Sequence, residues 1–209
     1  MDYTTYDRFM QELGSHRSTL NPSTDKPLVD ALITAASRWV DRECTGSADP
    51  DAVDYFLLET KTDQQLQGRV DRNGMILCYP RKPIVTAVSA MSYKARIQDP
   101  WTAVDTAEIN LAGGRVEAYP TGITFNLARA FVKMTYTGGL AASTAGLPAD
   151  LIELTTILAI RLYREAETGL TDAIGVAELG TLVYTQAIPV RVKAMMQPFK
   201  RTAGWRNIA

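Results

Sequence analysis

Three aspartates, Asp49, Asp51 and Asp54, are the residues whose type and spacing come closest to a chemical site. Neighbouring carboxylates can perform acid-base chemistry or bind a cation. These three flank Pro50 in a sequence typical of a surface loop, where solvation leaves carboxylates as ordinary acids. A small enzyme that depends on Asp51 or Asp54, and a weak cation site, are therefore alternatives rather than the main prediction.

Other reactive residue types lack the partners that catalysis or metal binding needs. The single histidine, His16, lies among polar residues and is predicted to be a solvated loop residue. Cys44 and Cys78 belong to no Cys-x-x-Cys or Cys/His cluster, so we expect buried, reduced thiols. The patterns of a nucleophile elbow and of phosphate-binding loops do not occur. We predict no catalytic residue, no metal site, no cofactor and no enzyme activity.

Composition predicts a folded protein with one main body. The 209 residues are 46% hydrophobic and 22% charged, which is typical of globular proteins. The length suits one body with one inserted module better than two enzyme domains. No run approaches the roughly 18 to 20 apolar residues of a membrane span, and the start lacks the pattern of a secretion signal. We expect a soluble protein without a membrane partner.

Charge is distributed unevenly along the chain. Residues 1–65 contain 12 acidic and 6 basic residues, whereas no acid follows Glu178. The C-terminal tail is therefore the natural candidate for docking on an acidic surface or for contact with phosphates. A basic tail that is merely solvated is the simpler alternative. The candidate contact residues are Arg191, Lys193, Lys200, Arg201 and Arg206.

Apolar periodicity predicts two long helices and a short closing helix. The first long helix covers residues 23–45, and the second covers residues 148–168. A loop over residues 170–187 precedes the closing helix, which begins at Pro189 and ends or kinks at Pro198.

The second long helix has an unusually wide apolar surface. Leucines three or four residues apart form one stripe, and a second stripe includes an isoleucine and a tyrosine. A helix that is apolar on more than one side must be covered from more than one side. The β-rich region can supply part of that cover, and a neighbouring subunit can supply the rest. The candidate residues of a subunit interface are Leu151, Ile152, Leu154, Leu158, Leu162 and Tyr163.

Residues 53–137 contain eight short runs with β-strand character, separated by turn signals. Residues 71–74 and 112–114 are predicted hairpin turns, because asparagine and glycine tolerate the positive φ that tight turns require. We expect a small antiparallel β module, packed on one face and solvated on the other.

These elements define the expected fold class and domains. The fold class is α+β: a bundle of long helices with an inserted small antiparallel β module and a C-terminal helix plus extended tail. The expected domains are an N-terminal arm over residues 1–25, a helical body with the C-terminal tail formed by residues 26–46 and 147–209, and the inserted β-rich module over residues 47–140.

Four stretches, taken in order, resemble the head-tail connector (adaptor, or head-completion) proteins of tailed bacteriophages. They are the first helix over residues 28–44, a proline-marked strand entry over residues 77–88, a strand-to-helix junction over residues 133–150 and a closing helix over residues 188–201. The order of the four motifs carries the resemblance, which spans most of the chain.

The resemblance implies a structural virion protein that works without catalysis or cofactor. It implies a homo-oligomeric ring of about twelve copies between the portal and the tail, which extends the DNA channel and completes the head for tail attachment. The implied partners are the portal protein, the next neck or tail-completion protein, and genomic DNA that passes without sequence recognition. The implied location is the virion neck, with the host cytoplasm during assembly. A nonspecific DNA-binding module that uses the basic C-terminal tail is the alternative function.

Overall fold

The computed structural model of the chain describes residues 1–14, 22–45, 53–112, 114–121, 129–167, 173–176, 181–184 and 188–200. It divides into two compact units. The helical unit is formed by residues 1–54 and 147–200, and the β unit by residues 55–146.

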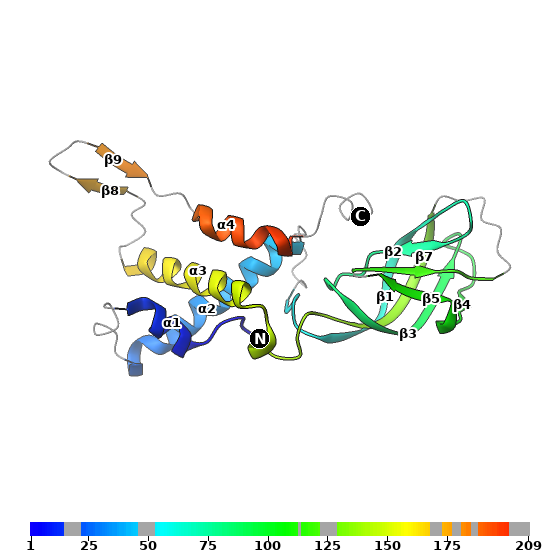
Figure 1. Cartoon of the computed structure of the whole chain (residues 1–209), viewed down its shortest axis with the longest axis horizontal. Coiled ribbons are helices and arrows are strands. Elements are labelled where there is room, and N and C mark those ends of the chain that lie inside the picture. The colour runs from blue at the N-terminus through cyan, green and yellow to red at the C-terminus, as the bar shows by residue number, and fades with distance from the viewer. Residues whose placement is uncertain are drawn as a thin grey trace. The chain divides into compact units, whose positions relative to one another are not determined.

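The helical unit contains α1 (Tyr6–Leu13), α2 (Pro22–Thr45), α3 (Ala149–Glu167) and α4 (Val190–Met196), and Figure 1 shows these four helices together. Helix α3 packs against each of the other three. Its Tyr163 ring meets the Phe9 ring of α1 edge to face, with centroids 5.7 Å apart. Each helix buries one apolar side, which is the usual source of stability for helices of this length.

Helix α1 lies in the region where the sequence analysis expected a polar arm. The Thr5 side chain accepts a hydrogen bond from the Arg8 backbone amide and so caps the helix. Phe9, Met10 and Leu13 recur at helical spacing and are buried. Only eight residues carry this pattern, which is too short a run to stand out from its polar surroundings.

The β unit is built on one seven-stranded sheet. In spatial order the strands are β4 (Thr102–Val104), β3 (Val85–Lys94), β7 (Arg129–Gly138), β1 (Glu59–Val70), β2 (Ile76–Cys78), β6 (Arg115–Ala118) and β5 (Ile109–Ala112). Neighbouring strands are antiparallel. Strand β3 also contacts β5, so the sheet curls until strands near its two edges approach each other.

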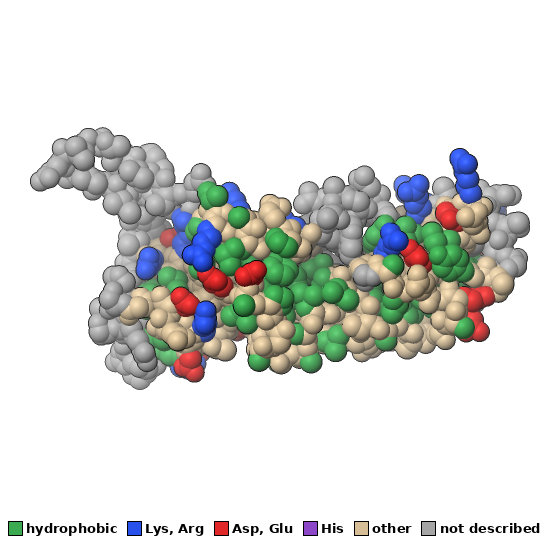
Figure 2. All heavy atoms as spheres, in the orientation of Figure 1, with side chains coloured by type: hydrophobic (Ala, Val, Ile, Leu, Met, Phe, Trp, Pro, Cys, Tyr) green, Lys and Arg blue, Asp and Glu red, His purple; other side chains and the backbone are tan. Residues whose placement is uncertain are grey.

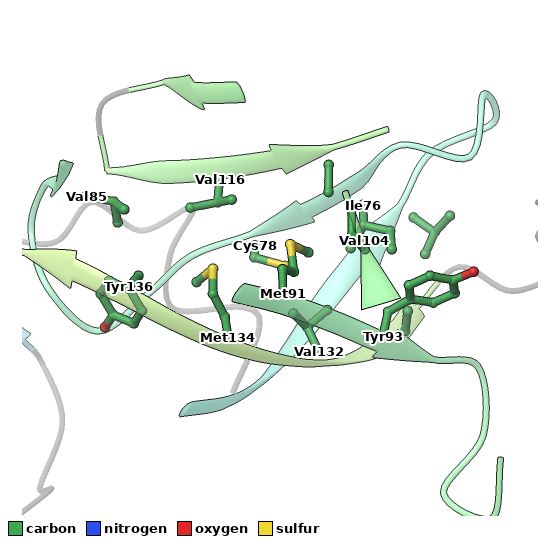
Figure 3. Packing of buried hydrophobic residues seen from close by; sticks show 13 residues of the cluster. Ile76, Cys78, Val85, Met91, Tyr93, Val104, Val116, Val132, Met134 and Tyr136 are labelled. Atoms are coloured by element: carbon green, nitrogen blue, oxygen red, sulfur yellow. The ribbon is translucent and has the colours of Figure 1, made fainter. Parts of the chain in front are cut away.

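The inner surface of the curled sheet holds the hydrophobic core of the β unit. Figure 3 shows Cys78, Met91 and Met134 directed into one space from β2, β3 and β7. Alternate residues of β7 from Ala130 to Tyr136 are buried, as expected for a strand with one face on the core. The curvature therefore lets a single sheet enclose its own core.

Both predicted hairpin turns are confirmed. Strands β1 and β2 pair across the first turn, where the Asp71 carboxylate accepts from the backbone amides of Asn73 and Met75 at 2.9 and 2.8 Å. Gly74 in this turn has a φ of 81°, which glycine adopts without steric cost. Strands β5 and β6 pair across the second turn, with Ala112 opposite Arg115.

The predicted fold class is wrong in its description of a bundle of long helices with a small inserted β module. Among the described residues, only α2 and α3 are longer than eight residues. The sheet has seven strands, and β1 alone runs for 12 residues. Because β1 is largely polar, an apolar pattern does not reveal its full length and predicts only short strands in this region.

The expected loop over residues 170–187 also differs from the structure. It contains a second, two-stranded sheet in which β8 (Ala173–Val176) pairs antiparallel with β9 (Thr181–Tyr184).

No helix in the described part of the chain is both long enough and apolar enough to cross a membrane.

Candidate functional site

The predicted interface residues of α3 mostly face the core of the helical unit. Leu151 and Leu154 are completely buried, and Leu158 and Tyr163 are buried almost as fully. Ile152 and Leu162 are half-buried. Because the chain itself already covers most of this surface, a subunit interface through these six residues stays a prediction, and their burial limits which of them can touch a neighbour.

The outward side of α3 carries two isoleucines that the sequence analysis did not select. At 100° per residue, Ile157 and Ile160 lie opposite the buried stripe of the helix, between Glu153 and Arg164. Both are half-buried, and Arg164 is exposed. The sequence does not show which side of α3 is buried, because a helix with apolar residues on every side can turn any of them toward the core of the helical unit.

Two of the predicted basic contact residues form ion pairs within the helical unit. The Arg191 guanidinium of α4 donates to the Glu153 carboxylate of α3. The Lys200 ammonium lies 3.3 Å from a Glu43 carboxylate oxygen of α2. Figure 2 shows acidic and basic side chains close together over α3 and α4. This part of the predicted contact surface is therefore locally neutralised.

The other predicted basic residues differ in how they are placed. Lys193 is exposed on α4. Arg201 and Arg206 lie outside the described residues.

Asp54, the described member of the aspartate group, belongs to a structural ion cluster. Its carboxylate accepts from Arg38 Nη1 at 2.9 Å and from the Met1 amino group at 2.7 Å. Burial alone would raise the pKa of Asp54, but these hydrogen bonds outweigh it and lower the pKa below its ordinary value. A carboxylate held in its ionised form by a guanidinium is poorly suited to accept a proton in catalysis.

The same cluster contains Asp41, which is fully buried. Its carboxylate accepts from the Tyr3 hydroxyl, from Arg38 Nη1 at 3.0 Å and from the Asp54 backbone amide at 3.1 Å. Two other segments of the chain, at Tyr3 and at Asp54, are thereby joined to the C-terminal part of α2. The sequence signal for this cluster was the spacing of three residues between Arg38 and Asp41, which places both side chains on one side of a helix.

Asp49, Asp51 and His16 lie outside the described residues. Among the described residues, no group of three or more His, Cys, Asp or Glu side chains is arranged to hold a metal ion.

Both cysteines are free and buried, and each lies in a different unit. Burial is the largest effect on both thiols and raises the pKa of Cys44 and of Cys78 to about 12. A thiol with so high a pKa has little thiolate at neutral pH, and the thiolate is the reactive form.

A buried lysine in the β unit is also structural. Lys82 is 2% exposed, and its ammonium donates to the Leu57 carbonyl oxygen at 2.9 Å and lies 3.1 Å from a Glu59 carboxylate oxygen. The Tyr136 hydroxyl accepts from the Lys82 backbone amide and donates to Gln64 at 2.6 Å. These bonds fix the chain before β3 against the start of β1.

The Glu59 ion pairs predict a loss of stability in acid. Burial alone would raise the pKa of Glu59, but hydrogen bonds from Lys61 and Lys82 lower it below the ordinary value of 4.5. A carboxylate with a lowered pKa stabilises the fold above its unfolded-state pKa, and this contribution is lost as the pH falls through the lower folded-state pKa. Urea unfolding measured from pH 7 down to pH 3 should show this decline, and Glu59→Gln should make it shallower. An identical pH profile for the variant would contradict the assignment.

Similar proteins were found through structure alone. No family model matches the chain, and no curated protein matches its sequence. One similar solved chain belongs to a structure described as the neck of an empty GTA particle computed with C6 symmetry, with 17% identity, a TM-score of 0.53, and coverage of 95% of this chain and 90% of that chain.

A second similar chain belongs to the virion of a native gene transfer agent (GTA) particle, with 18% identity, a TM-score of 0.52 and the same coverage. The protein therefore shares the fold of a chain found in virion-like particles and their necks. As far as the fold is concerned, the resemblance to head-tail connector proteins is confirmed.

Proposed function

We propose that this protein is a structural subunit of a particle neck, where copies form a ring between the portal and the tail. The observation that carries the proposal is the match of the whole fold, both units included, to a chain in the neck of a gene transfer agent particle. A ring of about twelve copies is compatible with the sixfold symmetry applied to that neck.

In this proposal the ring extends the DNA channel, completes the head and offers a platform to the next neck or tail-completion protein. The helices and the C-terminal segment form the connector body, and the β-rich region is the inserted module. The protein acts in the virion neck after assembly in the host cytoplasm, and its role is structural rather than enzymatic.

The outward side of α3 is the proposed contact between neighbouring copies. A closed ring uses two different patches on each subunit, and one patch must lie on the outside of the folded chain. Ile157 and Ile160 meet this condition, because they are apolar, incompletely buried and located on the side of α3 that faces away from its buried stripe. The surface they offer is small, which suits a subunit that assembles only when the portal is present as a template.

The exposed base on α4 is the proposed portal contact. Lys193 has the exposure that a docking residue needs. Arg191 and Lys200 can join it only by exchanging their intramolecular carboxylates for acidic groups of the portal. Such an exchange is sensitive to ionic strength, since the Arg191 and Glu153 side chains are both at least one-third exposed.

The proposal predicts that Ile157→Glu combined with Ile160→Glu prevents ring formation. Each new glutamate lies four residues before an arginine, Arg161 or Arg164, so it is compatible with the helix and can pair along it. Burying the new charges against a second copy is strongly unfavourable. Native mass spectrometry of the chain, alone and mixed with the portal protein of the same genome, should show rings for the unchanged protein and single copies for the double variant.

The matched control is Ile97→Glu, which places the same charge at a residue of the β unit that is already 72% exposed. It should assemble like the unchanged protein, and circular dichroism should show that all three proteins are folded. Absence of association with the portal for the unchanged chain, or normal rings for the double variant, would count decisively against the proposed interface.

A further inference from the structure

The β unit carries an excess of positive charge. Residues 55–146 contain ten Lys and Arg residues and seven Asp and Glu residues, whereas the rest of the chain contains 12 basic and 16 acidic residues. The net charge of −1 for the whole chain hides this division. A charge excess confined to one unit favours contact of that unit with an anionic partner.

Part of this charge is collected on the outer surface of three neighbouring strands. On β7 the even-numbered residues from Ala130 to Tyr136 are buried, so Arg129, Phe131 and Lys133 face outward. The registers place Arg69 of β1 opposite Arg129, and Lys94 of β3 opposite Phe131. Together with the neighbouring Trp101 these residues define the basic face, which comprises Arg69, Lys94, Trp101, Arg129, Phe131 and Lys133.

The centre of the basic face is an indole ring contacted by two ammonium groups. The Lys94 and Lys133 nitrogens lie 4.6 and 5.5 Å from the centroid of the Trp101 ring. Lys94 also lies 6.0 Å from the Phe131 ring centroid. Cation–π contacts of this kind hold the lysines in place. Two like charges are thus fixed near each other, and the Lys94 ammonium also donates to the Ile97 carbonyl oxygen at 2.7 Å.

The other end of the basic face is a pair of arginines on adjacent strands. Arg69 and Arg129 are both exposed and directly opposite each other, an arrangement that is unfavourable without an anion between or above them. Neither has a carboxylate partner among the described residues. The nearest acid to Lys133 is the exposed Asp63, at 3.9 Å.

Other acids of the β unit are used to hold backbone amides and neutral side chains elsewhere. Asp71, Asp99 and Asp105 each accept from a backbone amide of a turn, and Glu108 accepts from Thr121. These carboxylates are therefore engaged with groups of turns and loops rather than with the bases of the basic face.

We propose that the basic face binds the phosphodiester backbone of double-stranded DNA without reading its sequence. Arg129 and Lys133 are four residues apart, which is about 13 Å along a strand and roughly four base pairs of duplex at 3.4 Å each. The face can therefore touch several phosphates at once. The ammonium groups of Lys94 and Lys133 lie over the Trp101 ring, so the indole positions cations and does not stack on bases.

Duplex DNA fits this face better than an acidic protein does. Protein interfaces depend on a central apolar anchor that becomes buried, whereas the aromatic rings here lie beneath lysines. Phosphate contact requires only correctly spaced cations. The inference rests on the proposed function for the source of the DNA, the packaged genome, but its test is independent of ring formation.

The test measures binding of the full-length chain to a short fluorescent duplex by anisotropy over a series of NaCl concentrations. The logarithm of the binding constant should fall linearly with the logarithm of salt concentration, with a slope that changes by about 0.9 for each phosphate contact. Arg69→Gln with Arg129→Gln should make the slope shallower by about 1.8. Lys94→Gln with Lys133→Gln should have a similar effect.

Two matched double variants serve as controls. Lys61→Gln with Arg115→Gln removes two bases of the β unit that are paired with Glu59 and Glu117 outside the basic face, and should leave the slope unchanged. Arg201→Gln with Arg206→Gln tests the C-terminal tail in the same way. The arginine variant of the basic face relieves a like-charge pair, so urea unfolding should show no loss of stability that could explain weaker binding.

Failure of the unchanged chain to bind duplex at low salt would overturn the inference. So would an unchanged slope for both variants of the basic face, or a change of slope only in the tail variant. Variants of the basic face that bind DNA normally but no longer join portal rings would identify the face as a protein contact. That result would also overturn the inference. Ring formation is measured separately from DNA binding, so a failure of the DNA-binding inference can be told apart from a failure of the proposed function.

Discussion

Replacing Asp41 with alanine is expected to lower the free energy of unfolding by about 3 to 5 kcal/mol, the range for removing one partner of a buried ion pair. The Asp41 side chain is completely buried, and it accepts hydrogen bonds from Tyr3, Arg38 and the Asp54 backbone. Without it, three donors lose an acceptor in a place that water reaches poorly. Urea unfolding of the variant and of the unchanged chain measures the difference.

The matched control lies on the same helix. Asp30 pairs with Lys26 four residues earlier at 2.6 Å, but both side chains are about half exposed. Asp30→Ala should therefore change the free energy of unfolding by no more than about 0.5 kcal/mol. Similar losses for Asp30→Ala and Asp41→Ala would show that the buried cluster contributes no more than a surface pair.

Replacing Gly139 with valine is expected to destabilise the β unit by about 3 to 5 kcal/mol, through a forbidden backbone conformation and a steric clash together. Gly139 has a φ of 140°, and a Cβ atom there would lie 2.4 Å from the Leu57 carbonyl oxygen. Its amide also donates to the Ile84 carbonyl oxygen at 2.8 Å, so the backbone cannot move away without losing that bond. Thermal or urea unfolding followed by far-ultraviolet circular dichroism provides the measurement.

Gly14→Ala separates the two causes of this effect. Gly14 also has a positive φ, of 66°, but a Cβ atom there meets nothing within 4 Å. Only the conformational strain applies, so the expected loss is about 1 to 2 kcal/mol. Equal losses at the two positions would mean that the close approach of Leu57 has no energetic consequence.

Local patterns were sufficient to predict the long helices and the tight hairpins. The expected helices over residues 23–45 and 148–168 correspond to α2 and α3, because apolar spacing and terminal proline and glycine act within a few residues of each other. The Asp71 turn followed from the same kind of local chemistry. Helix α1 and strand β1 were missed, since one is short and the other is mostly polar.

The candidate surfaces could be predicted only in part. The subunit interface predicted on α3 stays a prediction, and the structure adds that four of its six residues, Leu151, Leu154, Leu158 and Tyr163, are buried within the helical unit. The sequence selected the basic residues near the C-terminus but not the carboxylates of Glu43 and Glu153 that pair with Lys200 and Arg191. The burial of α3 and these ion pairs both depend on residues of other elements, which no local pattern encodes.

The amino-acid sequence alone determined the positions of the two long helices, the turn chemistry, the uneven charge and the resemblance to connector proteins, because each depends on residue types at short separations. The tertiary structure decided which face of α3 is already covered, that Asp54 is bound to Arg38, and that Arg69, Arg129, Lys94 and Lys133 share one outer surface. Strand register places Arg69 beside Arg129 and Lys94 beside Phe131, which are 60 and 37 positions apart in the sequence, and a shift of one residue would turn each of them to the opposite face.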